Sequence, residues 1–160
     1  MKCNHLFALV VASLPFAVFT PASVSADPKD DEKAELARLA GTWKMTSYQK
    51  AGEERIKDQE DAPEIIITFK KDGSFDWANE VGSPGKIMRI DPSKKVKEID
   101  YLFTAGENEG KVEKGIYKLE RDTFTDCFNV PGGQERPSEF KSTKENGYSL
   151  AVYKRVKKID

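Results

Sequence analysis

The residue types that most often carry catalysis or bind metals are scarce in this chain. Its 160 residues include one histidine, His5, and two cysteines, Cys3 and Cys127. His5 and Cys3 lie within the first 26 residues, a segment with the features of a removable leader. Without them, neither a Ser-His nor a Cys-His nucleophile can form, and a zinc site would lack both histidine and a second thiolate. We therefore expect no metal and no cofactor.

Carboxylates are the groups that remain for chemistry. Glycoside hydrolysis needs only two acids at a fixed separation, and acids stand on expected strands at Asp76, Glu98, Asp100 and Asp126. We expect most of them to be solvated, and we expect that the protein is not an enzyme. A carboxylate-dependent hydrolase is the remote alternative, because it would require two of these acids in one pocket.

Asp126 is the acid whose orientation matters most. It alternates onto the strand face that carries Phe124 and Phe128. If that face points inward, Asp126 must be paired or protonated, and Arg136 or Arg155 could be its partner. If the face points outward, Asp126 is an ordinary solvated acid. We favour the outward orientation.

The leader is indicated by three features in the expected order. Lys2 is followed by a stretch over 6–19 that is almost entirely apolar, then by Val24-Ser25-Ala26, and charged residues begin at Asp27. The apolar stretch is shorter than the roughly 20 residues of a membrane-spanning helix. We expect cleavage after residue 26, export to the periplasm, cell envelope or medium, and no membrane span in the mature chain.

Charge and cysteine content further limit the functions that the chain could have. The 26 basic and 27 acidic residues give a net charge of −1, so there is no general field to attract nucleic acid. Cys127 would be the only thiol after cleavage, and we expect a small buried hydrophobe there. The run 58–61 lacks the glycine and glutamate spacing of a calcium loop, so we expect a solvated loop.

The elements that position these residues are short strands. Glu35-Leu36-Ala37-Arg38-Leu39-Ala40 suits a short helix that ends at Gly41. Alternating patterns separated by turn residues follow. The expected strands are 42–49, 65–69, 74–78, 86–90, 97–103, 112–119, 123–129, 139–142 and 148–156.

Sequential antiparallel strands in one domain predict an all-β fold, either a sandwich or an up-and-down barrel. We favour an up-and-down barrel of about eight strands with a short N-terminal helix, because closure removes exposed edges. We divide the chain into a leader (1–26), an acidic segment with the helix (27–40), the barrel (41–156) and a tail (157–160). An eight-stranded barrel has room for a packed core or for one small ligand.

Two resemblances support this architecture. Gly41-Thr42-Trp43 after a short helix, with Lys154-Arg155 in the last strand, resembles the pattern of lipocalin and calycin barrels. From about Leu39 to Arg155 the chain also resembles a family of small secreted lipocalin-like domains of unknown function that is abundant in planctomycete bacteria. The matching stretches are 41–43, 67–69, 90–92, 97–100, 115–119, 122–124, 127–128 and 136–140.

The resemblance implies a barrel and an exported location, and it implies no activity. It also implies that Gly41, Trp43 and Arg155 close one barrel end, with the tryptophan beneath the late basic side chain. Similar sequences tend to carry an apolar residue at the position of Asp126.

A large set of aromatic residues lies on the expected strands, and its default role is core. If the barrel is hollow, the same residues would hold a small apolar or amphipathic ligand. Our candidate ligand-binding residues are Phe69, Trp77, Phe103, Tyr117 and Arg136. For Arg136 we favour a role in fixing a loop to a carboxylate over anion binding at the barrel mouth. The alternative for the whole chain is a filled barrel that serves as a structural or protein-interaction module of the cell envelope.

Overall fold

The computed structural model describes residues 28–57, 64–78 and 82–157. The expected leader and the acidic run 58–61 lie outside these residues. The elements are α1 (Pro28–Leu39), β1 (Gly41–Lys50), β2 (Glu53–Lys57), β3 (Ile66–Phe69), β4 (Ser74–Trp77), β5 (Gly85–Asp91), β6 (Lys97–Phe103), β7 (Val112–Glu120), β8 (Thr123–Phe128) and β9 (Ser149–Arg155). Within the described part of the chain, no helix combines the length and apolar character needed to cross a membrane.

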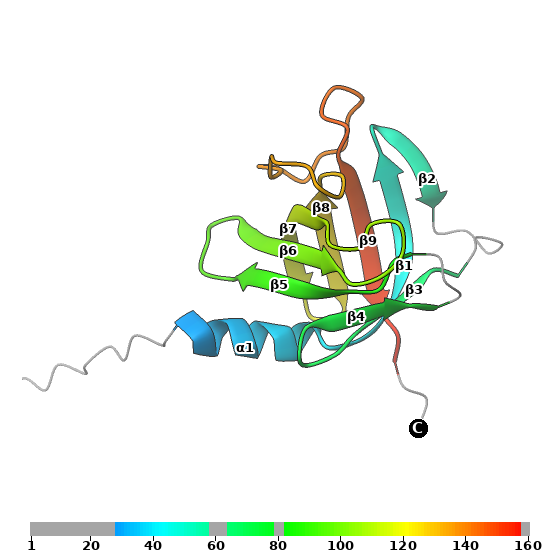
Figure 1. Ribbon diagram of the computed structural model, residues 1–160. Coiled ribbons are helices and arrows are strands. Elements are labelled where there is room, and N and C mark those ends of the chain that lie inside the picture. The colour runs from blue at the N-terminus through cyan, green and yellow to red at the C-terminus, as the bar shows by residue number, and fades with distance from the viewer. Residues whose placement is uncertain (1–27, 58–63, 79–81, 158–160) are drawn as a thin grey trace, which may run out of the picture.

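The strands form one antiparallel sheet that closes into an eight-stranded barrel (Figure 1). From β3 to β9 each strand pairs with the next along the chain, and β9 pairs back with β1. The predicted up-and-down barrel with a short N-terminal helix is therefore confirmed. Closure pairs the first and last strands of the barrel, β1 and β9, with each other.

Strand β2 is an addition to this barrel that the sequence did not predict. Gly41–Lys44 of β1 pairs with β3, and Ser47–Lys50 pairs with β2 along the same edge. A two-residue turn, Ala51-Gly52, joins β1 to β2, and both residues have positive φ (50° and 78°). This is the backbone of a tight hairpin turn. The segment between the expected strands 42–49 and 65–69 is thus partly a strand.

Helix α1 covers one end of the barrel (Figure 1). It is longer than predicted, because its acidic first turn with Asp30 and Asp31 is also helical, as favoured by the helix dipole. Leu36 and Leu39 pack against the barrel core. We call the barrel end covered by α1 the helix end, and the opposite end, where β4 and β8 finish, the loop end.

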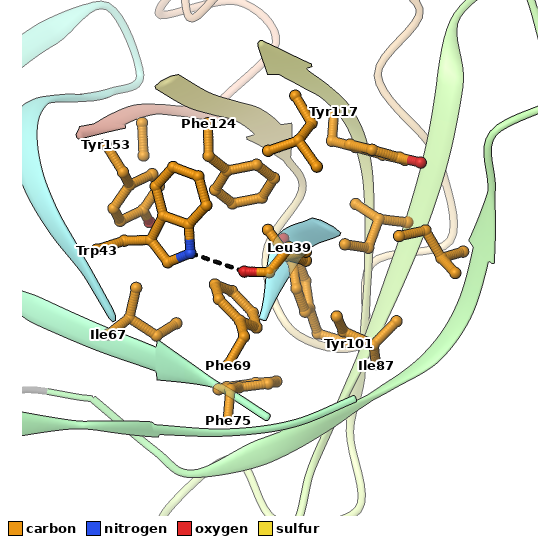
Figure 2. Close-up of a cluster of buried hydrophobic side chains, with 14 of the residues drawn as sticks. Leu39, Trp43, Ile67, Phe69, Phe75, Ile87, Tyr101, Tyr117, Phe124 and Tyr153 are labelled. Carbon is orange, nitrogen blue, oxygen red and sulfur yellow. Dashed lines mark hydrogen bonds between the residues drawn. The ribbon is translucent and has the colours of Figure 1, made fainter. Parts of the chain in front are cut away.

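The core is built mainly from aromatic rings (Figure 2). Trp43 and Phe124 are fully buried, and their ring centroids are 5.9 Å apart. Phe124 also stacks on Tyr153 at 5.5 Å and meets Phe69 edge-on at 5.8 Å. Offset and edge-to-face pairs of this kind add to the free energy that burial provides.

The segment 129–148 is a loop that packs on the outer face of β7 and β8. The expected strand over 139–142 is absent, because the backbone of this segment bonds locally and to side chains instead of joining the sheet. Cys127 of β8 lies under this loop, and Pro137 lies within it; both are almost fully buried. Cys127 is therefore a small buried hydrophobe as predicted, although the loop buries it on the outside of the barrel.

Candidate functional site

A cavity of about 300 Å³ opens inside the barrel toward the loop end. Most of the side chains around it are aromatic or aliphatic, and no described residue of α1 contributes to it. Its apolar lining is Met45, Tyr48, Ile56, Ile65, Ile67, Phe69, Phe75, Trp77, Tyr101, Phe103, Phe128, Pro131 and Tyr153. The volume lies at the lower end of the range for small-molecule pockets.

The inner part of the cavity is rigidly packed. Phe69, Phe75 and Tyr101 are each at most 5% exposed. Phe75 meets Phe69 at 5.7 Å and stands edge-on to Tyr101 at 5.6 Å. These contacts hold the rings in fixed positions, so the inner surface is preformed.

The rim of the cavity is more accessible. Trp77, Phe103 and Phe128 are half-buried at the ends of their strands. Ser83, Asn108 and Pro131 are also half-buried, and they come from three loops between strands. The opening of the cavity is therefore bordered by apolar side chains and a few polar groups.

Two carboxyl groups stand on the wall of this apolar cavity, Glu113 from β7 and Asp126 from β8. Asp126 is 3% exposed and Glu113 is 7% exposed. The hydroxyl of Tyr101 donates to Asp126 Oδ2 at 2.8 Å. Asp126 Oδ1 is also buried, and it has no hydrogen-bond partner among the described residues.

The strand register explains how these groups meet. Tyr101 is paired with Glu113 across β6 and β7, and Asp126 is paired with Tyr117 across β7 and β8. Gly115 lies between Glu113 and Tyr117 on β7 and has no side chain. The Tyr101 hydroxyl can therefore reach across β7 to Asp126.

Burial controls the protonation of both acids. Removal from water raises the pKa of Asp126 to about 7, although the Tyr101 hydrogen bond and a backbone hydrogen bond lower it. Burial and the negative charge of Asp126 raise the pKa of Glu113 to about 9, with a small opposing effect of Lys50. Glu113 is therefore protonated at neutral pH, whereas Asp126 changes its protonation in the neutral range.

The neighbouring tyrosines stay neutral. Burial and the charge of Asp126 raise the pKa of Tyr101 and of Tyr153 well above the usual range. Among the described residues that line the cavity, none is lysine or arginine. The charge of the described cavity lining thus depends on the ionisation of Asp126, and no positive side chain balances it.

The outward orientation that the sequence favoured for Asp126 is wrong. Asp126 and Phe124 both point into the barrel, and neither Arg136 nor Arg155 is the partner of the carboxylate. Glu113 was not singled out from the sequence at all. The signal was present, because Glu113 shares the alternation of Tyr117 and Leu119, which are both buried.

Three of the five candidate ligand-binding residues line the cavity, namely Phe69, Trp77 and Phe103. Tyr117 does not. It lies at the helix end, where its hydroxyl donates to Glu35 Oε1 at 3.0 Å. Tyr117 therefore belongs to the packed end of the barrel. It does not line the cavity, contrary to our expectation for a ligand-binding residue.

Arg136 also lies away from the cavity, on the outer face of β6 and β7. Its guanidinium pairs with Asp100 at 2.7 Å and donates to the carbonyls of Ile99 and Gly115 at 3.1 and 2.6 Å. These contacts fix the loop 129–148 to the barrel wall. The loop-fixing role favoured from the sequence is confirmed, and the placement of Arg136 in a ligand site is wrong.

The residues expected to close one barrel end do so at the helix end. The guanidinium of Arg155 lies 4.0 Å from the centroid of the Trp43 ring and donates to the carbonyls of Ala40 and Arg38 at 2.9 and 2.6 Å. The indole of Trp43 donates to Leu39 O at 2.8 Å (Figure 2). Gly41 has a φ of 135°, and a Cβ there would come within 2.6 Å of Arg155 Nη1.

The comparisons with known proteins returned nothing: no protein-family model, no curated protein and no solved structure matches this chain. Within the described residues, no group of three or more histidine, cysteine, aspartate or glutamate side chains is placed to hold a metal ion. The site therefore has to be interpreted from its own geometry.

Proposed function

We propose that this chain is an exported, lipocalin-like binding protein that holds a small, largely apolar molecule inside the barrel and has no enzymatic activity. The observation that carries the proposal is the cavity of about 300 Å³ with its aromatic and aliphatic lining. A well-formed apolar cavity with a few converging polar groups is the usual form of a small-molecule site.

The same cavity argues against the filled-barrel alternative. A filled eight-stranded barrel would have to use its inward side chains to occupy the interior to normal packing density. Here the barrel interior near α1 is occupied by fully buried side chains such as Trp43 and Phe124, whereas the loop end keeps an open volume next to half-buried rings. A molecule bound there would bury the half-buried rings of the rim, which is favourable in proportion to the apolar area covered.

The direct test is a titration of the mature chain with N-phenyl-1-naphthylamine, an uncharged probe that fluoresces in apolar surroundings. We expect saturable binding of one probe per chain. Ile65→Trp should abolish it, because Ile65 is a half-buried lining residue and an indole there fills the cavity from the rim. The matched control is Val156→Trp, at a position that is 41% exposed and outside the cavity. Equal binding by all three proteins, or by none, contradicts the proposal.

Export has its own test. When the chain of residues 1–160 is produced in a bacterium, the exported form should have the intact mass of residues 27–160. Retention of residues 1–26 in all recovered material would contradict the proposed leader.

A second candidate function is favoured by one observation. Glu113 and Asp126 stand in one cavity with pKa values of about 9 and about 7. A difference between the pKa values of two neighbouring carboxyl groups is found where one donates a proton and the other accepts one. The test is hydrolysis of nitrophenyl glycosides and esters. Turnover that disappears in Glu113→Gln would establish a hydrolase, whereas turnover at the buffer rate in both proteins supports the binding function.

A further inference from the structure

The polar groups of the cavity point to the chemistry of its ligand. We propose that the barrel selects an amphipathic amine, whose ammonium group binds the free oxygen of Asp126 while its apolar part lies among the aromatic rings. This inference rests on the proposed binding function and deepens it by naming the class of ligand.

The first observation is the unused acceptor. Asp126 Oδ2 accepts a hydrogen bond from Tyr101, and Oδ1 is buried without a partner at the cavity wall. A buried carboxylate oxygen without a donor is costly. A ligand that supplies N–H donors at this point removes that cost.

The second observation is the sign of the charge. Glu113 and Asp126 both line the cavity, and no described lining residue carries a positive charge. A carboxylate ligand would bring a further negative charge into this apolar space, and repulsion would exclude it. An ammonium ion would instead pair with Asp126 at short range in surroundings of low polarity.

The third observation is the set of rings around the two acids. Phe75 stands edge-on to Tyr101, and Tyr101 contacts Asp126 through its hydroxyl. Tyr153 lines the same cavity. Tyr101 presents its hydroxyl to the carboxylate, and these rings form an apolar wall against which the hydrocarbon part of the ligand would lie.

The protonation of Asp126 makes the selection depend on pH. The groups that face it are Tyr101 of β6, Glu113 of β7 and Tyr153 of β9, and Lys50 and Tyr48 of β1 act on Glu113 and Tyr153. Of Asp126, Glu113, Tyr101 and Tyr153, only Asp126 has a pKa near 7. An amine that binds the ionised form should therefore bind about tenfold more tightly at pH 8 than at pH 6, whereas a neutral alcohol should not.

The experiment compares octylamine, 1-octanol and octanoate as competitors that displace N-phenyl-1-naphthylamine. We expect octylamine to bind at least tenfold more tightly than 1-octanol at pH 8, and octanoate to bind most weakly. In Asp126→Asn the octylamine affinity should fall at least tenfold and lose its dependence on pH. The affinity of 1-octanol should stay within threefold. Asp76→Asn is the matched control, because Asp76 is an exposed acid on β4 and outside the cavity.

The outcomes separate the two proposals. If the probe binds but octylamine is no better than 1-octanol, or if Asp126→Asn changes nothing, the amine inference is overturned and the binding function stands. If the probe and all competitors fail to bind the wild-type chain, both proposals are overturned.

Discussion

Each end of this barrel contains a buried acid, and the two acids are treated in opposite ways. At the helix end, burial alone would raise the pKa of Glu35, but Lys97, Tyr117 and Arg38 surround it and hold the pKa below the ordinary value. At the loop end, Asp126 has one hydroxyl donor and no cation, and burial raises its pKa to about 7.

The two ends also differ in whether their buried polar groups have partners within the protein. The helix end satisfies each polar group that it buries, since the Trp43 indole, the Arg155 guanidinium and the Glu35 carboxylate all have protein partners. The loop end leaves an oxygen of Asp126 unpaired next to an open volume. The helix end therefore pairs its buried charge within the protein, and the loop end holds the cavity to which we assign the proposed binding function.

The largest expected effect is on the helix end. Trp43→Ala should lower the free energy of unfolding by about 3–5 kcal/mol, because the ring is fully buried against Phe124 and Arg155. Phe103→Ala at the half-buried rim should cost only about 1–2 kcal/mol. Urea unfolding of both variants checks this. A loss below 1 kcal/mol for Trp43→Ala would contradict the barrel-closing role.

The next effect is the pH dependence of stability, which should be dominated by the loop end. Folded-state pKa values raised above the unfolded ones mean that the folded chain binds protons more tightly. The stabilisation is complete below about pH 4 and is lost as the pH rises through about 7 for Asp126 and about 9 for Glu113. Unfolding free energy should fall by a few kcal/mol between pH 5 and pH 9. Asp126→Asn should remove the part of this loss that falls between about pH 4 and pH 7, and an unchanged slope over that range would contradict the account.

A smaller effect on stability is expected when Glu35 and Asp126 are each replaced by the corresponding amide. Glu35→Gln should destabilise by about 1–2 kcal/mol at pH 7, because it removes charge-assisted bonds to Lys97 and Arg38. Asp126→Asn should be neutral or stabilising at pH 7, because it removes the partial ionisation of a buried group that lacks a cation. Thermal unfolding of the pair measures the difference. Equal losses would mean that the two ends do not differ in this way.

The smallest effect concerns a position outside both ends. Cys127 is buried beneath the loop 129–148, and burial raises the pKa of its thiol to about 11. Cys127→Ala should therefore cost about 1 kcal/mol or less and leave probe binding unchanged. Rapid alkylation of the native thiol at pH 8 would show that the loop does not cover it.

The barrel could be predicted because its signals are local. Alternation along 97–103 and 112–119 and the turn residues between strands give the meander directly. Gly41, Trp43 and Arg155 follow a pattern that fixes how the helix end closes. Two exceptions have different causes. Strand β2 depends on the turn Ala51-Gly52, whose positive φ values alanine seldom adopts. Residues 139–142 were expected to be a strand, but they lie in the loop 129–148 and do not pair with the sheet.

The site was harder to predict because it depends on which face of a strand points inward. We expected Asp126 to point outward, but the structure places its carboxylate in the apolar interior, where burial is normally costly. Arg136 could not be placed beyond its loop until its pairing with Asp100 was visible. The size of a cavity is set by how side chains from eight strands meet, and no local pattern encodes it.

The central claim is that the loop end is hollow and receives a ligand while the helix end is filled. A crystal structure of residues 27–160 grown with N-phenyl-1-naphthylamine tests it most directly. The account predicts density for the probe in contact with Phe69, Phe75 and Tyr101, with Trp43 and Arg155 unchanged. A barrel whose side chains fill the interior, with the probe absent or bound only on the surface, would contradict it.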